Sequence, residues 1–140
     1  MPGIILTHSG LPDPAQADAL AAELAELTCR YLKKERGRTM VMLRHQPKDQ
    51  WYIAGTSLEK DGRNSFRLEV SITEETNTKD EKAAFHKAAF ALLSERLGNL
   101  HPHSNVHVID CRATSYGYGG VTQEWRYQQG SEGLVAQAGE

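Results

Sequence analysis

Hydrophobic and polar positions follow the same order twice along the chain. A shift of 65 residues places 51–55 (WYIAG) on 116–120 (YGYGG), each an aromatic side chain followed by a short run that ends in glycine. The same shift places the apolar run 41–43 (VML) on 106–108 (VHV), which has the β-branched and large side chains typical of strands. Self-similarity at a fixed offset indicates two copies of one structural unit.

Two amphipathic helices occupy matching places in the two halves. Residues 13–16 (DPAQ) supply an N-cap, a proline at the first helical position and a glutamine that can reciprocate, while 78–81 (TKDE) form a capping box. The apolar positions that follow recur at helical period. They are Leu20, Leu24, Leu27 and Tyr31 in the first half. The corresponding residues in the second half are Phe85, Ala89, Leu92, Arg96 and Leu97.

Candidate strands precede both helices, at 3–8 (GIILTH) and 66–73 (FRLEVSIT). The order predicts an α+β fold of two tandem β-α-β repeats, about residues 2–58 and 66–123, in one four-stranded mixed sheet with both helices on one face. We expect the opposite face to be apolar and to be covered by an oligomer that closes into a barrel. The residues expected there are Ile4, Leu6, Val41, Leu43, Val70, Val106 and Val108.

Composition places these elements in one ordinary globular domain. The chain has 140 residues, 39% hydrophobic and 24% charged, so we expect a single domain at 1–127, a polar linker at 59–64 and a flexible tail at 128–140. Sixteen basic against 18 acidic residues give a net charge of -2, which argues against nucleic-acid and membrane partners and favours a small molecule. Two distant cysteines and the lack of an apolar span or signal peptide predict a cytoplasmic protein.

Pro2 is the residue with the most distinctive chemistry. It follows the initiator methionine, which is commonly removed before proline, and removal would leave a secondary amine. An α-amino group has a pKa of roughly 7.7–8.0, and burial at the head of a strand would lower that pKa toward a value suited to a general base. The alternative is that Pro2 only begins an edge strand, where its missing N–H costs nothing.

Met1-Pro2 before a strand, the β-α-β duplication and the hairpin segments WYIAG and SYGYGG together resemble the tautomerase superfamily, over roughly residues 2–127. That superfamily includes 4-oxalocrotonate tautomerase, macrophage migration inhibitory factor, 5-carboxymethyl-2-hydroxymuconate isomerase and the cis-3-chloroacrylic acid dehalogenases. Residues 92–110 are similar to the second helix and following strand of migration inhibitory factor, and 41–55 to the matching stretch of the cis-dehalogenases. The resemblance implies a homotrimer in which the amino-terminal proline is the acid/base catalyst and neighbouring subunits complete each site.

The resemblance also implies substrate-binding residues. His107 falls where a neighbouring subunit supplies a strand Tyr or Arg, and Lys34 corresponds to a lysine near the end of the first helix that suits an anionic substrate. Arg67 occupies the repeat-equivalent position of Pro2, and Arg38 is a further cation for a carboxylate or enolate. Trp51 and Tyr116 would form apolar walls.

Simpler roles stay open for the same residues. His107 could be a strand histidine with a local hydrogen bond, and Lys34 could be part of a solvated helix end. Trp51 and Tyr116 could belong to the hairpin cores. His101, His103 and His107 suggest a metal site at first sight, but no cysteine or carboxylate set completes one, so neither metal nor cofactor is expected.

The sequence departs from some family members. Pro12 stands where 4-oxalocrotonate tautomerase has an arginine, and Cys29, residues 74–76 and Ser115 stand where the cis-dehalogenases have a histidine, paired arginines and a glutamate. The leading hypothesis is therefore a tautomerase in which Pro2 interconverts enol and keto forms of a small unsaturated 2-oxo acid. The alternatives are a hydratase or dehalogenase like the cis-3-chloroacrylic acid enzymes, and a trimeric binding module without turnover.

Overall fold

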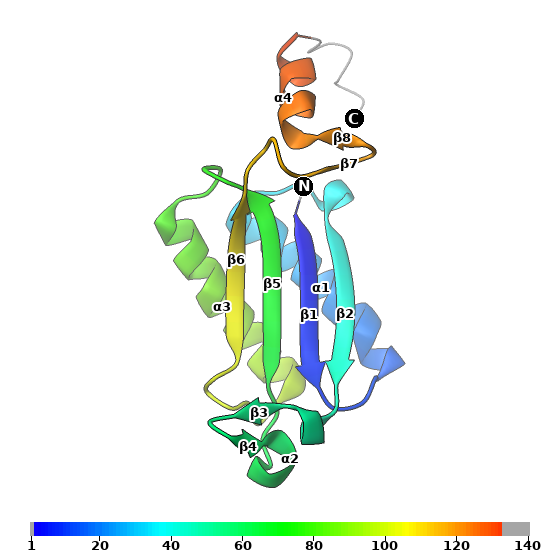
Figure 1. Ribbon diagram of the computed structural model, residues 1–140, viewed down its shortest axis with the longest axis vertical. Coiled ribbons are helices and arrows are strands. Elements are labelled where there is room, and N and C mark those ends of the chain that lie inside the picture. Colours follow the sequence, from blue (N-terminus) through cyan, green and yellow to red (C-terminus); the bar gives the residue numbers. More distant parts are fainter. Residues whose placement is uncertain (1, 133–140) are drawn as a thin grey trace.

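A four-stranded mixed sheet organises the protein in the computed structural model, which describes residues 2–132. Its strands are β1 (Gly3–Ser9), β2 (Met40–Gln46), β5 (Phe66–Thr73) and β6 (Asn105–Cys111), in the order β2-β1-β5-β6 (Figure 1). β1 runs parallel to β2 and β5 parallel to β6, while the two central strands β1 and β5 are antiparallel. This is the expected α+β sheet built from two β-α-β units.

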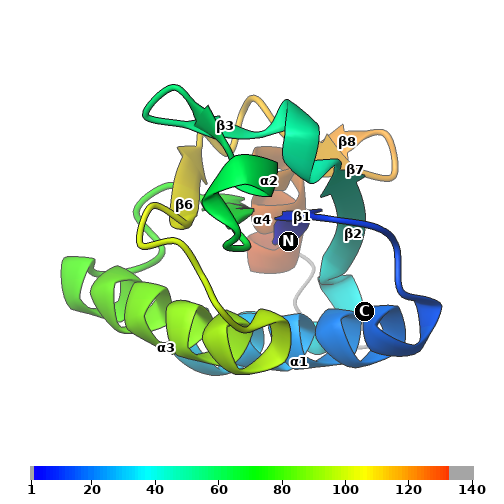
Figure 2. The same ribbon diagram turned by 90° about the horizontal axis from the view of Figure 1, so that it is seen from below.

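Helices α1 (Pro14–Leu32) and α3 (Lys79–Leu97) both cover one face of this sheet (Figure 2). The capping box at Thr78 and Glu81 is present as predicted, and Asp13 caps α1 by accepting from the Ala15 N–H. Gln16 does not make the return hydrogen bond of a capping box to the Asp13 backbone. Its Nε2 instead donates across the helix pair to the Arg96 carbonyl at 2.8 Å. None of the helices within residues 2–132 is both long enough and apolar enough to cross a membrane.

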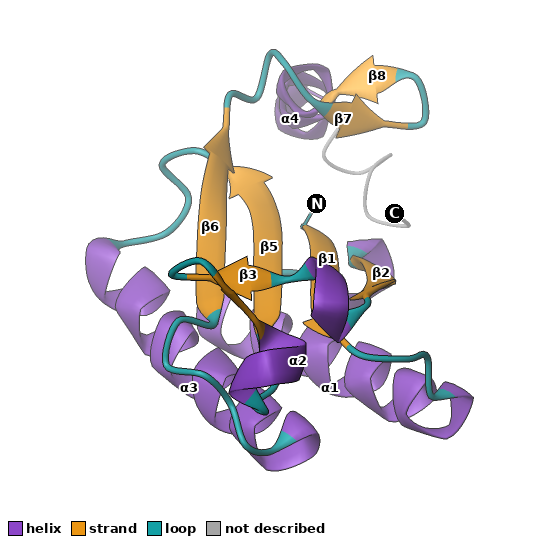
Figure 3. Cartoon of the chain, turned by 60° about the horizontal axis from the view of Figure 1, so that its bottom comes forward, coloured by secondary structure: helices purple, strands orange, loops and turns teal. Residues whose placement is uncertain are grey.

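Two small hairpins lie at opposite ends of the sheet (Figure 3). The first joins β3 (Tyr52–Ile53) to β4 (Thr56–Ser57), and the second joins β7 (Gly117–Tyr118) to β8 (Val121–Thr122). Both glycine-rich segments thus form hairpins, as predicted. Gly117 is required in the second one, because a Cβ atom there would lie 1.9 Å from the Val121 carbonyl oxygen.

The remaining short elements correct two expected boundaries. Part of the expected linker at 59–64 is helical, in α2 (Leu58–Asp61). Helix α4 (Gln123–Glu132) follows β8 and includes residues 128–132, which the sequence assigned to a flexible tail. The rest of that tail, 133–140, lies outside the described residues. Single turns of 3-10 helix, η1 (Arg36–Arg38) and η2 (Lys48–Gln50), precede β2 and β3.

The apolar strand residues face the helices, which corrects the expectation that they lie on the uncovered face. Ile4, Leu6 and Val70 are fully buried in the core, and four further strand residues pack against it. Those four are Val41, Leu43, Val106 and Val108. Since side chains alternate along a strand, the uncovered face carries Met42 and Ile109 together with polar residues such as Glu69.

The two halves also differ by a one-residue slip. Gly3 pairs with Met40, but the residue paired with Asn105, which lies 65 positions after Met40, is Arg67. β5 therefore lies 64 residues after β1, whereas the helices and hairpins keep the offset of 65. The expected equivalence of Arg67 with Pro2 is wrong, because Arg67 matches Gly3 and the buried Phe66 matches Pro2.

Candidate active site

Pro2 is buried at the head of a central strand. Its carbonyl accepts a hydrogen bond from the Met40 N–H at 3.2 Å, which fixes the start of β1 against β2. On the other side, Gly3 pairs with Ser71, so Pro2 lies next to the last residues of β5. The edge-strand interpretation of Pro2 is therefore wrong. The first residue of a central strand is a place where the sheet loses little by a missing N–H.

Arg38 belongs to an apolar pocket beside this end of β1. The pocket has a volume of about 450 Å³ and is bounded by η1, the start of β2 and the second hairpin. Its lining residues are Gly37, Arg38, Thr39, Met40, Gly117 and Tyr118. Met40 connects the pocket to Pro2 through the backbone hydrogen bond above. The Arg38 guanidinium, whose Nε lies 3.3 Å from a Glu35 carboxylate oxygen, supplies positive charge in an otherwise apolar pocket.

Lys34 lines a second pocket of about 340 Å³, under helix α4, and the surface of this pocket is mostly apolar. The other lining residues are Thr73, Thr76, Ala113, Gln123, Glu124 and Tyr127. The Lys34 Nζ donates to the Thr76 hydroxyl at 2.8 Å. Burial lowers the pKa of Lys34, although the carboxylates of Glu81 and Asp110 oppose that shift. The Lys34 ammonium group is therefore partly desolvated at the edge of this pocket.

Tyr116 contributes a hydroxyl group to the same end of the sheet. Its hydroxyl is hydrogen-bonded to the hydroxyl of Thr73, the last residue of β5, and the Gln123 side chain bonds to it as well. Burial raises the pKa of Tyr116, so the group is a neutral phenol at physiological pH. The expectation of a purely apolar wall is incomplete, since this ring carries a fixed polar group.

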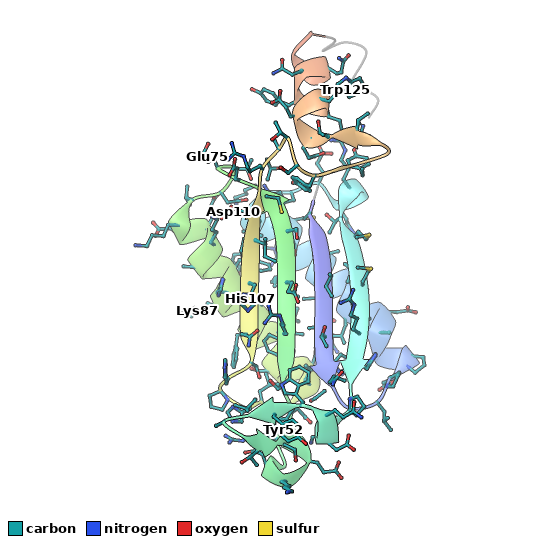
Figure 4. All side chains as sticks on the ribbon, in the orientation of Figure 1. Tyr52, Glu75, Lys87, His107, Asp110 and Trp125 are labelled. Atoms are coloured by element: carbon teal, nitrogen blue, oxygen red, sulfur yellow. The ribbon has the colours of Figure 1, made fainter. Side chains whose placement is uncertain are left out.

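Three expected site residues, His107, Arg67 and Trp51, lie away from the end of the sheet that holds Pro2. His107 is level with Ile5 across the sheet, three residues and two strands from Pro2, which corresponds to roughly 14 Å between Cα atoms. Figure 4 shows His107 midway along β6, where its Nε2 lies 3.2 Å from the Asn105 side-chain oxygen. Arg67 begins the opposite end of β5 and pairs with Glu69 at 3.0 Å, and Trp51 precedes the hairpin at that end.

Thr73, Thr76 and Gln123 are site residues that sequence reasoning missed. The predicted order of strands could have indicated Thr73, because the end of β5 must lie beside the start of an antiparallel β1. Thr76 and Gln123 reach the site through a loop and a helix start that the repeat does not predict. Across residues 2–132, no group of three metal-ligating side chains comes together, and the His101 Nδ1 accepts from the His103 N–H.

Comparison with known proteins identifies the fold. A wild-type fused 4-OT described as a symmetric trimer superposes with a TM-score of 0.74 at 18% identity, over 87% of this chain and 96% of that one. The chain has the tautomerase superfamily fold. Two further structures of this fold match it. Pt0534 inactivated by 2-oxo-3-pentynoate gives a TM-score of 0.78 at 15% identity, covering 89% of this chain and 98% of that one.

The second similar structure is that of a macrophage migration inhibitory factor-like protein from Entamoeba histolytica, with a TM-score of 0.67 at 13% identity, covering 86% of this chain and 97% of that one. No family model matches the sequence, and no curated protein matches it either. The likeness therefore lies in the tautomerase fold, which spans nearly the whole of each related structure.

Proposed function

We propose that the protein is a cofactor-independent tautomerase whose catalytic group is the amine of Pro2, released when Met1 is removed. Its substrate is a small unsaturated 2-oxo acid in enol and keto forms. The observation that carries the proposal is the position of Pro2, buried at the head of β1 at the end of the sheet that holds the Arg38 and Lys34 pockets. A buried amine favours its neutral form, which is the form that can take up a proton.

The reaction needs one proton carrier. The Pro2 nitrogen takes a proton from the carbon next to the substrate carbonyl, and the resulting ammonium gives that proton to the carbonyl oxygen; ketonisation of the enol is the reverse. Nearby positive charge stabilises the enolate that forms between these two steps. Lys34 and Arg38 are the cations of the same chain that line pockets at this end, and either can bind the substrate carboxylate.

A homotrimer would complete the site. The similar fused 4-OT is a trimer, and the uncovered face of this sheet exposes Met40, Met42 and Ile109. Two further copies packed on that face would remove this apolar surface from water. His107 and Arg67, which also lie on that face, and Trp51 are then candidates for contacts with a neighbouring copy's substrate.

We place the protein in the cytoplasm. Cys29 and Cys111 are both free thiols, the condition that a reducing compartment maintains. Expression as a fusion to a fluorescent protein and microscopy would test this placement. Signal confined to an envelope or to the medium would contradict it.

Titration of the Pro2 amine separates a tautomerase from a binding module of the same fold. With the nitrogen of proline labelled, its chemical shift is followed against pH in the folded protein and in the same chain unfolded in urea. We expect the folded amine to titrate below the free value of roughly 7.7–8.0, because a general base must be neutral near pH 7. Equal values in both states, or an amide signal from retained Met1, would contradict the proposal.

A further inference from the structure

A series of hydrogen bonds crosses the end of the sheet that carries Pro2. The Lys34 Nζ donates to the Thr76 hydroxyl at 2.8 Å, and that hydroxyl donates to the Thr73 carbonyl at 2.6 Å. The Thr73 hydroxyl in turn bonds to the Tyr116 hydroxyl, which the Gln123 side chain also contacts. These residues come from the loop after α1, from β5 and its following loop, and from the second hairpin with α4. The network therefore holds the Tyr116 hydroxyl in one place.

That place is close to the Pro2 amine within one chain. Gly3 pairs with Ser71, so Thr73 lies one residue beyond the position opposite Pro2 on the neighbouring strand. Strand spacing and rise put the Cα atoms of Pro2 and Thr73 about 6 Å apart. Figure 1 shows the second hairpin, which follows Tyr116, directly above the start of β1. A small acid in contact with the amine therefore lies within reach of Tyr116.

Gln123 places a hydrogen-bond acceptor near the Tyr116 hydroxyl. Its Oε1 is buried and has no hydrogen-bond partner among the described residues, although buried polar atoms are normally satisfied. Gln123 and Thr73 line the same pocket as Lys34. A ligand group that both accepts from a phenol and donates to an amide oxygen fits this pair. The 2-oxygen of an enolisable acid has this property, since it accepts as a carbonyl and donates as an enol.

We propose that Tyr116 and Gln123 form a same-chain subsite for the 2-oxygen of the substrate, an inference that rests on the proposed function. Pro2 takes the proton from C3, the electrons of that C–H bond form the C2–C3 double bond, and the carbonyl π electrons move onto the 2-oxygen. The Tyr116 hydroxyl donates to that developing oxyanion. The proton that Pro2 holds then moves to the 2-oxygen, which gives the enol, and the enol O–H donates to the Gln123 Oε1. Ketonisation runs the same steps in reverse, with Pro2 taking the O–H proton and returning it to C3.

The variant Tyr116→Phe tests the donor. Tyr116→Phe, Pro2→Ala and wild type are assayed together for ketonisation of phenylenolpyruvate and 2-hydroxymuconate. We expect kcat of Tyr116→Phe to fall by roughly a hundredfold with a small change in KM, as for other lost oxyanion donors. The control is Tyr52→Phe, a tyrosine of the first hairpin that is 65% exposed and lies at the far end of the sheet, and its kcat should equal that of wild type.

Two more variants keep the test independent of folding defects. Thr73→Val leaves the phenol but removes its hydroxyl partner, and kcat should fall by a smaller factor than in Tyr116→Phe. Gln123→Leu removes the buried acceptor, and KM for the enol form should rise more than KM for the keto form. Equal melting temperatures of wild type and variants by circular dichroism accompany the kinetics.

The outcomes separate the two claims. Activity that is lost in Pro2→Ala but unchanged in Tyr116→Phe overturns the subsite and leaves the proposed function standing. A rise in KM alone for Tyr116→Phe also overturns it, because a donor to the enolate acts on kcat. A wild type without activity toward either acid overturns the proposed function, and the subsite with it.

Discussion

Lys34 and Lys33 are adjacent lysines in different surroundings, which makes them a matched pair. Lys34 lines the pocket under α4, whereas Lys33 is exposed and its Nζ donates to the Arg30 carbonyl. We expect Lys34→Met to raise KM for a carboxylate substrate about tenfold, the loss of one charge-assisted hydrogen bond. Steady-state kinetics with Lys33→Met as the control measure it. Equal KM values in the two variants would contradict a carboxylate-binding role for Lys34.

The lowered pKa of Lys34 also gives that interaction a pH dependence. The ammonium form binds the carboxylate, and burial lowers the pKa at which this form is lost. KM should therefore rise with increasing pH at a lower pH than an exposed lysine would produce, and the rise should be absent in Lys34→Met. A KM profile that is the same in wild type and Lys34→Met would show that another group causes the dependence.

His8 makes the stability of the fold sensitive to acid. It is 5% exposed, its ring centroid is 4.2 Å from that of His45, and burial followed by repulsion from His45 lowers its pKa. The unfolded chain then binds more protons than the folded one as pH falls through 6.5, so the free energy of unfolding falls with it. Urea unfolding between pH 7 and 5 should show this loss, and a smaller one in His8→Gln. An equal slope in both proteins would be evidence against His8.

Among the secondary-structure elements, α3 has an N-cap, Thr78, that should contribute measurably to the free energy of unfolding. The Thr78 hydroxyl accepts from the Glu81 N–H at 3.1 Å, and the Glu81 carboxylate accepts from the Thr78 N–H at 2.8 Å. Thr78→Ala should lower the free energy of unfolding by about 1 kcal/mol. Thr114→Ala, in the turn before β7, is the control and should leave that energy unchanged. Equal unfolding midpoints in urea for the two variants would contradict the capping role.

The repeat predicts elements well because their signals are local. Helix starts, the two glycine hairpins and the strand 66–73 each depend on a few neighbouring residues, and the structure has them where the sequence indicates. The one-residue slip of β5 could not be predicted from the sequence, because an offset of 65 fits both helices and both hairpins. The pairing of β5 with β6 reveals the difference. The predicted faces of the strands are wrong because the two helices already bury the apolar side chains, which therefore need no oligomer to cover them.

The slip changes which residue of the second half corresponds to Pro2. Phe66, not Arg67, matches Pro2, and its ring is fully buried 5.8 Å from that of Phe90. A phenylalanine in mid-chain offers packing and no titratable nitrogen. The end of the sheet where β5 begins therefore has a buried aromatic pair at the place where the end at which β1 begins has the proposed catalytic residue.

At the scale of the whole molecule, the uncovered face of the sheet should hold a trimer together. Met42 is 37% exposed in the middle of β2 on that face, and covering it on all three copies would bury apolar surface. Met42→Glu should dissociate the assembly to monomers at micromolar concentration, measured by sedimentation equilibrium. Leu11→Glu, at a loop residue that is 83% exposed away from this face, is the control and should remain trimeric. A monomeric wild type would contradict the homotrimer.

Assembly also limits what the sequence could predict about the site. Pro2, Lys34, Arg38 and Tyr116 lie at one end of the sheet in a single chain, and all four are among the residues predicted from the sequence. His107, Arg67 and Trp51 lie away from that end, so a role for them in the proposed site would require contacts between copies. The hydroxyl partner of Tyr116 was missed because it comes from the end of β5, which only the sheet brings near the hairpin.

The most direct test of the account is the intact mass of the purified protein together with ketonisation of 2-hydroxymuconate and phenylenolpyruvate by wild type and Pro2→Ala. The account predicts a mass lacking Met1 and a rate that falls by roughly a hundredfold or more in the variant, as for a lost general base. Retained methionine, or equal rates in the two proteins, would contradict catalysis by Pro2.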